Sequence, residues 1–340
     1  MNSHEAAPGR AAVVCGVGAA LPDTVVSNAQ LCTTLDSTDE WIRTRTGIGS
    51  RHIAGPDIST QDLAVDAARR ALLCAHDVRP DAVLVATTTP DHRCPATAPA
   101  VAARLDLTGI PALDLAAGCT GFLYALATAA GFIASGQADT VLVIGADRLS
   151  TLPGRGDRST VPLFGDGAGV MVLRAGPATA PGALGPVVLG SDGTGGDLIK
   201  AGHQTPLQMS GSEVFRHAVH RMSAASVQAA RAAQWRLDDV DRLVAHQANA
   251  RITAFAARQL GIPEHRQVHN IADVGNTGAA SIPLLLAQAA ADGRIKAGHR
   301  VLLTAFGAGL TWGATTLIWP ELAPLPSTAT TESVREGATL

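Results

Sequence analysis

Short apolar runs alternate with longer alanine-rich stretches along the chain. The short runs are rich in valine and resemble strands, and they cover residues 11–18, 81–89, 140–146, 241–247 and 300–308. The stretches of helical length between them lie at residues 61–76, 119–136, 213–233 and 250–260. Continuous apolar strands that alternate with helices are typical of layers in which both faces of a sheet are covered. The pattern therefore predicts an α/β fold.

The order of these features in the first half of the chain returns in the second half. Each half has a strand-like run, then a Gly-x-Thr-Gly turn, a small-residue helix and a further strand-like run. The paired positions are Asp81 with Asp241, Cys119 with Asn276, and Val141 with Val301. Two copies are too few for a solenoid, so the repeat predicts two pseudo-symmetric layers whose central helices pack together. On this alignment Cys119 and Asn276 occupy equivalent positions at the two helix starts.

Proline and glycine cluster between the two copies, which divides the chain into an N-terminal half at residues 10–180 and a C-terminal half at residues 185–320. Residues 326–340 have no apolar period and are expected to form a flexible tail. The charge-free segment between Asp114 and Asp139 is long enough for a membrane span, but its residues are mainly small. We therefore expect a helix buried in the core and no membrane partner.

Composition limits the classes of function. The chain has 340 residues, 46% of them hydrophobic, with 26 basic against 29 acidic residues. Nucleic-acid binders carry a basic excess, so no nucleic-acid partner is expected. The five cysteines form no Cys-x-x-Cys pair, and His217 and His220 lack a metalloprotease motif, so neither a metal site nor a disulfide framework is predicted. Scattered cysteines, and a strand-like run at 11–20 in place of a signal-peptide core, favour a cytoplasmic protein.

Three residues could form a nucleophilic centre. Cys119 opens a helix directly after the strand-like residues 111–115, where backbone N–H groups and the positive helix end would lower the pKa of its thiol. His246 ends a strand-like run, from which its ring can reach a crevice. If the two halves pack about a pseudo-twofold axis, Asn276 faces Cys119 and the three side chains converge. Each residue taken alone has an ordinary structural role as its alternative, such as a small cysteine packed between helices.

Six segments in one order connect these residues to a known family. They are DSTDEWIRTRTGI (36–48), DLAAGCTGF (114–122), FGDGAG (164–169), AHQANARI (245–252), GNTGAASIP (275–283) and AFGAGLTWG (305–313). Together they resemble the β-ketoacyl-acyl carrier protein synthase III family of the thiolase fold, which includes polyketide-priming members. The resemblance implies a five-layer αβαβα subunit with two pseudo-symmetric halves, usually in a homodimer. It also implies condensation of an acyl-CoA primer with malonyl-acyl carrier protein, which initiates fatty-acid or polyketide synthesis.

On this resemblance Cys119 is the nucleophile that takes the acyl group from CoA. His246 and Asn276 then donate hydrogen bonds to the malonyl thioester oxygen, where charge develops as carbon dioxide leaves. No proton has to be removed from carbon, because decarboxylation generates the carbanion. The backbone N–H groups of Cys119 and Ala308 match the oxyanion hole of the family, which often has glycine at the second position. No cofactor or metal is implied.

The resemblance also assigns the residues that hold CoA. Trp41 and Arg158 match the pair that holds the adenine between an indole ring and a guanidinium group. Arg45 matches a residue near the CoA phosphates, while Gly211 and Asn249 match contacts to the pantetheine. Without the family motifs, Trp41 has an apolar anchor as its alternative role, and Arg45 a surface charge.

Substrate and partner contacts involve five further residues. Phe306 resembles the gate beside the nucleophile, with a plain core aromatic as its alternative. Cys94 stands where straight-chain enzymes often carry a bulky aromatic, in a loop that reaches the partner's acyl pocket, so we expect room for a primer larger than acetyl. Arg216, Arg251 and Arg258 fall on helical stretches and are expected to attract the acidic carrier protein. A solvated helix face is the alternative for the first and last of these arginines.

Two other functions stand beside condensation. An acyltransferase on the same fold would move an acyl group without forming a carbon–carbon bond, and it would not need Asn276 to stabilise an enolate. A non-catalytic partner subunit would typically lack the nucleophile, whereas Cys119, His246 and Asn276 are all present. The sequence leaves open the primer, the carrier of the extender (CoA or carrier protein) and the choice between fatty-acid and polyketide synthesis.

Overall fold

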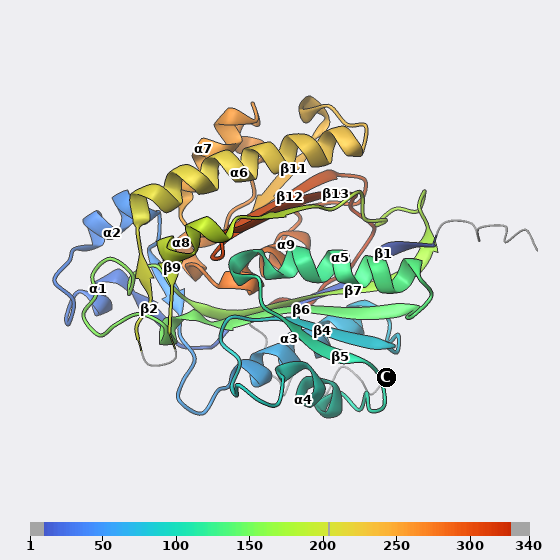
Figure 1. Ribbon diagram of the computed structural model, residues 1–340, viewed down its shortest axis with the longest axis horizontal. Coiled ribbons are helices and arrows are strands. Elements are labelled where there is room, and N and C mark those ends of the chain that lie inside the picture. Colours follow the sequence, from blue (N-terminus) through green and yellow to red (C-terminus); the bar gives the residue numbers. More distant parts are fainter. Residues whose placement is uncertain (1–9, 203–204, 328–340) are drawn as a thin grey trace, which may run out of the picture.

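The computed structural model describes residues 10–202 and 205–327. These residues form five layers, in which two β-sheets alternate with three layers of helices (Figure 1). The helices of the three layers are α3 (Thr60–Cys74) and α4 (Thr97–Arg104) outside the first sheet, α5 (Gly121–Ala134) and α9 (Ser281–Ala291) between the sheets, and α6 (Gly211–Ala232) and α7 (Ala250–Gln259) outside the second sheet. The α/β fold predicted from the pattern of the chain is confirmed, as is the five-layer architecture that the resemblance implies.

Each sheet is built from its own half of the chain. The first has the order β1 (Arg10–Ala20), β7 (Asp166–Pro177), β6 (Thr140–Arg148), β4 (Ala82–Ala86), β5 (Ala112–Leu115). The second has the order β11 (Arg242–Ala245), β12 (Arg300–Gly307), β13 (Thr311–Ile318), β8 (Val188–Ser191). β4 runs parallel to β5 and β6, as β11 does to β12, and the other pairs are antiparallel. Parallel strands need crossover helices, which supply the layers on both faces.

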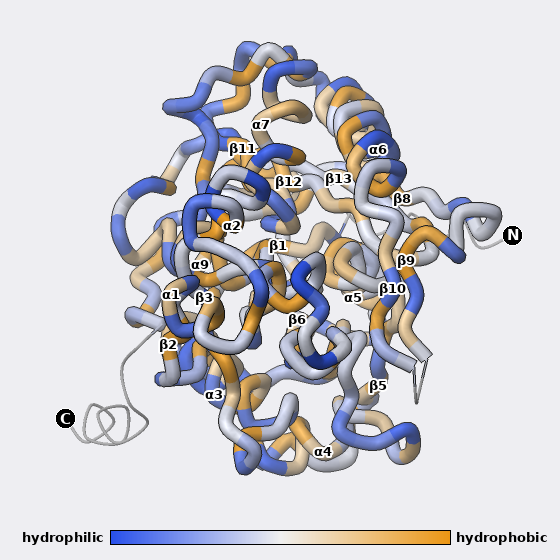
Figure 2. The backbone as a smooth tube through the Cα atoms, turned by 90° about the vertical axis from the view of Figure 1, so that its left-hand side faces the viewer, coloured by the Kyte–Doolittle hydropathy of each residue, from blue (hydrophilic) through white to orange (hydrophobic). Residues whose placement is uncertain are grey.

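Short elements gather at one end of the layers, on the left in Figure 1 and towards the viewer in Figure 2. They are β2 (Val25–Ser27), α1 (Asn28–Leu31), α2 (Asp39–Thr46), β3 (Ser50–His52), β9 (Ile199–Lys200), β10 (Gln208–Met209) and α8 (Ile271–Val274). β2 pairs with β3, and β9 pairs with β10, in two small antiparallel sheets. Two small sheets and three short helices therefore lie at this end of the layers.

The two central helices form the middle of the largest hydrophobic cluster. α5 contributes Phe122, Leu123 and Leu126, and α9 contributes Leu284 and Leu285, all with at most 1% of their surface exposed. The charge-free segment is thus a core helix, as expected. In the described part of the chain, no helix is both long and apolar enough to cross a membrane.

The two halves repeat with a constant offset of 160 positions, which corrects the alignment drawn from the sequence. The matched element starts are Ala82 with Arg242, Gly118 with Gly278, Gly121 with Ser281, and Thr140 with Arg300. Both turn glycines have positive φ, 52° at Gly118 and 59° at Gly278, so each opens its 3-10 turn in the same way. Cys119 is therefore equivalent to Ala279. The predicted equivalence with Asn276 was wrong because matching the letters of the two Gly-x-Thr-Gly motifs shifts the register by three residues.

Hydrogen bonds hold residues 326 and 327, with which the predicted tail begins. Arg70 Nη1 donates to the carbonyl oxygen of Pro326 at 2.9 Å, and Gln288 Nε2 donates to Ser327 Oγ at 3.1 Å. Of the predicted tail at 326–340, residues 328–340 lie outside the described residues.

Candidate active site

A cavity of about 560 Å³ runs from the end that carries the short elements towards the two central helix starts. Its exposed lining residues include Arg45 and Arg158, whereas His246 and Asn276 have 2% and 6% of their surface exposed. The cavity therefore leads from the surface to the interior. Of the residues predicted from the sequence, it is lined by Trp41, Arg45, Cys119, Arg158, Gly211, His246, Asn249, Arg251, Asn276, Phe306 and Ala308.

Cys119 lies in a 3-10 turn, Gly118–Thr120, directly before α5. This turn packs tightly against Gly307, the last residue of β12, and against Ala308, which follows it. A Cβ atom added at Gly307 would lie 2.7 Å from the backbone nitrogen of Cys119, and one added at Gly118 would lie 3.0 Å from the nitrogen of Ala308. Only glycine permits these approaches. Cys119 and Ala308, whose backbone N–H groups are predicted to form an oxyanion hole, therefore lie on neighbouring segments, and both residues line the cavity.

Burial and the neighbouring carboxylate of Asp147 raise the pKa of the Cys119 thiol to about 12. The backbone N–H of Cys119 itself opposes this shift, but its effect is smaller than that of burial. The expectation of a lowered pKa was therefore wrong, because the sequence shows the helix start and not the depth at which the sulfur lies. The resting side chain is a neutral thiol.

His246 follows β11 at the carboxyl end of the strand, as predicted. Its backbone N–H donates to Thr304 on the neighbouring β12 at 2.8 Å, which fixes the residue at the sheet. Neither ring nitrogen has a hydrogen-bond partner among the described residues, although both are buried. Burial lowers the pKa of the imidazole to about 4. A neutral ring at pH 7 offers one N–H donor to a bound ligand.

Asn276 is held on both sides of its backbone by the loop before β7. Its N–H donates to Leu163 at 2.9 Å, and its carbonyl accepts from Gly165 at 3.0 Å. The side-chain Oδ1 accepts from the N–H of Gly278 at 2.9 Å. Because the oxygen is engaged within its own turn, the amide group left to act in the cavity is the Nδ2 donor. Two neutral donors, from His246 and Asn276, thus line the cavity with Cys119.

Two guanidinium groups lie near the ring of Trp41 at the outer end of the cavity. The guanidinium carbons of Arg158 and Arg45 are 5.1 Å and 5.9 Å from the centre of its ring. A flat base between Trp41 and Arg158 needs two stacking contacts of about 3.5 Å each. The pair is therefore closed in this structure, and an adenine would have to separate it.

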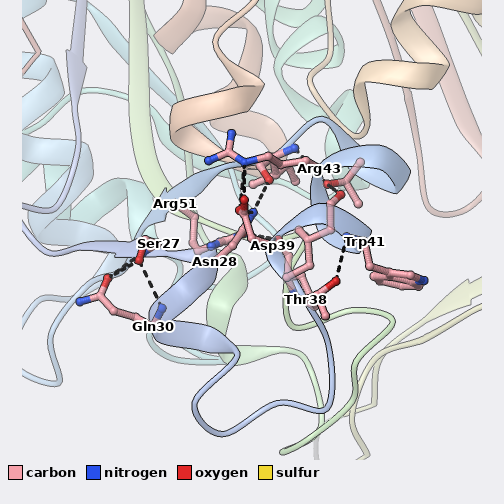
Figure 3. A network of polar contacts seen from close by, with 12 residues as sticks. Ser27, Asn28, Gln30, Thr38, Asp39, Trp41, Arg43 and Arg51 are labelled. Carbon is pink, nitrogen blue, oxygen red and sulfur yellow. Dashed lines mark hydrogen bonds and ion pairs between the residues drawn. The ribbon is translucent and has the colours of Figure 1, made fainter.

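A buried arginine connects the Trp41 helix to the rest of the site (Figure 3). Arg51 is fully buried, and its Nη2 donates to Asn28 Oδ1 at 2.7 Å and to the carbonyl of Pro162 at 2.9 Å. Asn28 Nδ2 in turn donates to Asp39 at the start of α2, at 2.7 Å. The network joins α2, which carries Trp41, to the loop that precedes β7 and holds the backbone of Asn276. Sequence reasoning missed this residue.

Comparison with known proteins decides the family. Models described as "3-Oxoacyl-[acyl-carrier-protein (ACP)] synthase III" and its "C terminal" part match residues 113–193 and 230–319. The chain is 54% identical to beta-ketoacyl-[acyl-carrier-protein] synthase III 3 of Streptomyces coelicolor, over 93% of this chain and 99% of the relative. The chain belongs to the 3-oxoacyl-[acyl-carrier-protein] synthase III family.

Solved structures of relatives have the same fold. The synthase III of Pseudomonas aeruginosa PAO1 has a TM-score of 0.90 at 50% identity and covers 93% of this chain and 100% of its own. The priming β-ketosynthase from the R1128 polyketide pathway has a TM-score of 0.88 at 38% identity, covering 94% and 99%. The thiolase fold expected from the resemblance is thus confirmed, and the structural neighbours of the chain include a polyketide-priming ketosynthase.

The other residues suggested by the synthase III resemblance divide into two groups. Asn249 is the N-cap of α7, where its Oδ1 accepts from Arg251 N at 2.9 Å and its Nδ2 donates to the carbonyl of Arg45 at 3.0 Å. Gly211 begins α6, and Phe306 lies in β12 next to Gly307 with 4% of its surface exposed. These residues line the cavity. Three further predicted residues are exposed and do not line it, namely Cys94, Arg216 and Arg258.

Sequence reasoning also missed Asp147, a fully buried carboxylate at the end of β6. Its hydrogen-bond partners are distant in the sequence, and Ala279 is 132 positions away. No local motif marks such a residue. In residues 10–202 and 205–327, no group of three or more His, Cys, Asp or Glu side chains is placed to hold a metal ion.

Proposed function

We propose that the chain catalyses the decarboxylative condensation of an acyl-CoA primer with malonyl-acyl carrier protein. The product is a β-ketoacyl-acyl carrier protein, which initiates fatty-acid or polyketide synthesis. The observation that carries the proposal is the convergence of one thiol, Cys119, and two neutral donors, His246 and Asn276, on one cavity. Family membership supports the same reaction.

In the first half-reaction the sulfur of Cys119 attacks the acyl-CoA thioester. The N–H groups of Cys119 and Ala308 stabilise the oxyanion of the tetrahedral intermediate, because both residues line the cavity where Gly118 and Gly307 let the two backbones approach. CoA leaves as a thiol and takes up the proton that Cys119 loses. Since burial keeps this thiol protonated at rest, the proton departs only as the new C–S bond forms.

In the second half-reaction the malonyl group loses carbon dioxide. Negative charge develops on the thioester oxygen, and hydrogen bonds from His246 and Asn276 Nδ2 stabilise it there. The resulting carbanion attacks the acyl thioester of Cys119, forms the carbon–carbon bond and releases the sulfur, which takes up a proton. Loss of carbon dioxide supplies the electron pair, so the proposed reaction uses no cofactor or metal.

The two alternatives fit this site less well. Transfer of an acyl group without condensation creates no enolate and does not use a second donor, whereas Asn276 is held with its Nδ2 as the remaining donor. A non-catalytic partner subunit does not need a nucleophile. Cys119, however, lies in the same cavity as the residues proposed to bind CoA. Both observations favour condensation.

The proposal includes a docking surface for the carrier protein on α6 and α7. Arg251 lies 5.7 Å from the ring of Phe215, and Arg258 lies 4.3 Å from the ring of Phe255. Phe255 is 40% exposed although it is a large hydrophobic residue. Basic groups attract an acidic partner and the exposed ring of Phe255 gives it a contact, which supports this surface, and Arg216 on α6 is also exposed.

We also propose a homodimer in the cytoplasm. β5 is the last strand of the first sheet and its outer edge is unpaired among the described strands, so a second copy could extend the sheet. Cys94 is exposed in the loop that precedes α4, and its predicted contact with the acyl pocket of the second copy stays a prediction.

All five cysteines are free thiols, which is in keeping with a reducing compartment such as the cytoplasm.

The experiment is intact-protein mass spectrometry after incubation with acetyl-, propionyl-, isobutyryl- and longer acyl-CoAs. We expect one acyl adduct on the wild-type protein and none on Cys119→Ala, and the mass of the adduct names the primer. The absence of an adduct with every acyl-CoA would contradict the proposed first step. An adduct that persists in Cys119→Ala would place the nucleophile elsewhere.

A further inference from the structure

The carboxylate of Asp147 accepts hydrogen bonds from both halves of the fold. Its Oδ1 accepts from Thr88 N at 2.6 Å, Thr89 Oγ1 at 3.2 Å and Thr87 Oγ1 at 3.3 Å, all in the segment that follows β4. Its Oδ2 accepts from the N–H of Ala279, in the turn that opens α9, at 2.8 Å. A fully buried carboxylate is retained only where such donors compensate for its lost hydration.

The pseudo-symmetry of the fold relates the contact between Asp147 and Ala279 to the turn that carries Cys119. Ala279 is the counterpart of Cys119, and Gly307 is the counterpart of Asp147, each 160 positions away. In the C-terminal half, the N–H at the start of the central helix binds a carboxylate oxygen of the protein itself. In the N-terminal half, the position equivalent to Asp147 is Gly307, which has no side chain. The N–H of Cys119 can therefore bind an oxygen of the substrate. The same turn therefore binds an anionic oxygen twice, once structurally and once in the reaction.

Asp147 is linked to Asn276 through Gly278, which contacts both residues. A Cβ atom added at Gly278 would lie 2.3 Å from Asp147 Oδ2, so this turn rests directly on the carboxylate. The N–H of Gly278 donates to Asn276 Oδ1 and thereby orients the amide. A shift of the turn would consequently rotate or displace the Nδ2 donor.

We propose that Asp147 is a positioning residue for malonyl decarboxylation, which anchors the start of α9 so that the Nδ2 of Asn276 faces the thioester oxygen. The inference rests on the proposed function and adds Asp147 to the residues on which the reaction depends. Asp147 touches no substrate atom on this account. It acts through the Ala279–Gly278 turn.

The test uses Asp147→Asn, which keeps the shape and removes one acceptor oxygen. Three donors point at Oδ1 and one at Oδ2, so the amide oxygen of the variant stays with the threonines and its NH₂ group faces the N–H of Ala279. Because two donors then face each other, we expect the turn before α9 to move in this variant. Acylation of Cys119 is not slowed, because the carboxylate of Asp147 is one of the causes that raise the pKa of this thiol.

Two steps are measured separately, acylation by intact mass and single-turnover release of carbon dioxide from malonyl-acyl carrier protein by the acylated enzyme. For Asp147→Asn we expect the rate of acylation to stay within threefold of wild type. We expect decarboxylation to be about 100-fold slower, because misplacing a reacting group such as the Nδ2 donor by about 1 Å costs about that factor in rate. The double variant with Asn276→Ala should be no slower than Asn276→Ala alone, because both changes remove the same donor. Equal slowing of both steps, or a further loss in the double variant, would overturn the inference.

Asp166→Asn is the matched control for loss of a buried carboxylate. Asp166 is fully buried at the start of β7, and its oxygens accept from Ala54 N at 2.8 Å, Ser150 N at 2.9 Å and Ser150 Oγ at 2.7 Å. We expect it to lower the melting temperature while the ratio of the two rates stays at the wild-type value. If it changes this ratio as Asp147→Asn does, the effect belongs to fold stability and the inference is wrong. If the wild-type enzyme releases no carbon dioxide, the proposed function itself fails.

Discussion

A methyl group at position 307 would meet the backbone of the nucleophile. In Gly307→Ala the new Cβ would lie 2.7 Å from Cys119 N, 3.0 Å from Thr120 N and 3.1 Å from Thr120 Oγ1. Ordinary contacts of a Cβ atom begin at 3.4 Å, so the turn must move by about 0.7 Å. The first atom displaced or covered is the N–H that is proposed to bind the oxyanion.

The expected loss follows from removal of one oxyanion-hole donor. Such a loss costs about 100- to 1,000-fold in rate, or about 3–4 kcal/mol of transition-state stabilisation. The assay is single-turnover acylation of Cys119 by the preferred acyl-CoA, followed by intact mass. We expect Gly307→Ala to acylate at least 100-fold more slowly than wild type, with a melting temperature lowered by overpacking.

Gly131→Ala is the matched control. Gly131 lies in α5, the helix that Cys119 precedes, and an added Cβ would have no atom within 4 Å. We expect unchanged acylation and a gain in stability of about 1 kcal/mol, since alanine favours the helix. The reasoning is refuted if Gly307→Ala acylates within threefold of wild type.

Three more predictions concern the thiol, the CoA end of the cavity and the buried arginine. Because burial raises the pKa of Cys119 to about 12, the rate of its alkylation by iodoacetamide should rise steadily between pH 7 and pH 10; a plateau by pH 8 would contradict this. Trp41→Ala should raise the KM for acyl-CoA about tenfold with little change in kcat, measured by steady-state kinetics, because stacking holds substrate and transition state alike; a fall in kcat alone would argue against it. Arg51→Met leaves Asn28 Oδ1 and the carbonyl of Pro162 without a donor, and should lower the free energy of unfolding in urea by about 2–3 kcal/mol; an unchanged midpoint would show that the network is dispensable.

The layers were predictable because the pattern of the chain is strongly periodic. Continuous apolar strands such as β4, in which every residue is buried, leave no alternative to a sheet covered on both faces. The charge-free stretch became α5 because small residues let a helix fit between two sheets. The position of His246 followed from the end of its strand. These features depend on neighbours in the sequence.

The errors and omissions depend on distant contacts. The thiol pKa was expected in the wrong direction because burial of Cys119 comes from segments such as residues 307–308. Asp147 reaches donors 59 and 132 positions away, and Arg51 reaches Pro162 across 111 positions. The repeat was misaligned because a shared motif outweighed the spacing of the strands. Only the fold distinguishes Ala279, the counterpart of Cys119, from Asn276.

The most direct test is the mass of the carrier protein after acylated enzyme is mixed with malonyl-acyl carrier protein. The account predicts a carrier protein that has lost carbon dioxide and gained the acyl group, a β-ketoacyl thioester, with the wild-type enzyme and not with Asn276→Ala. A carrier protein that gains only the unextended acyl group would contradict the account and assign the chain to acyl transfer.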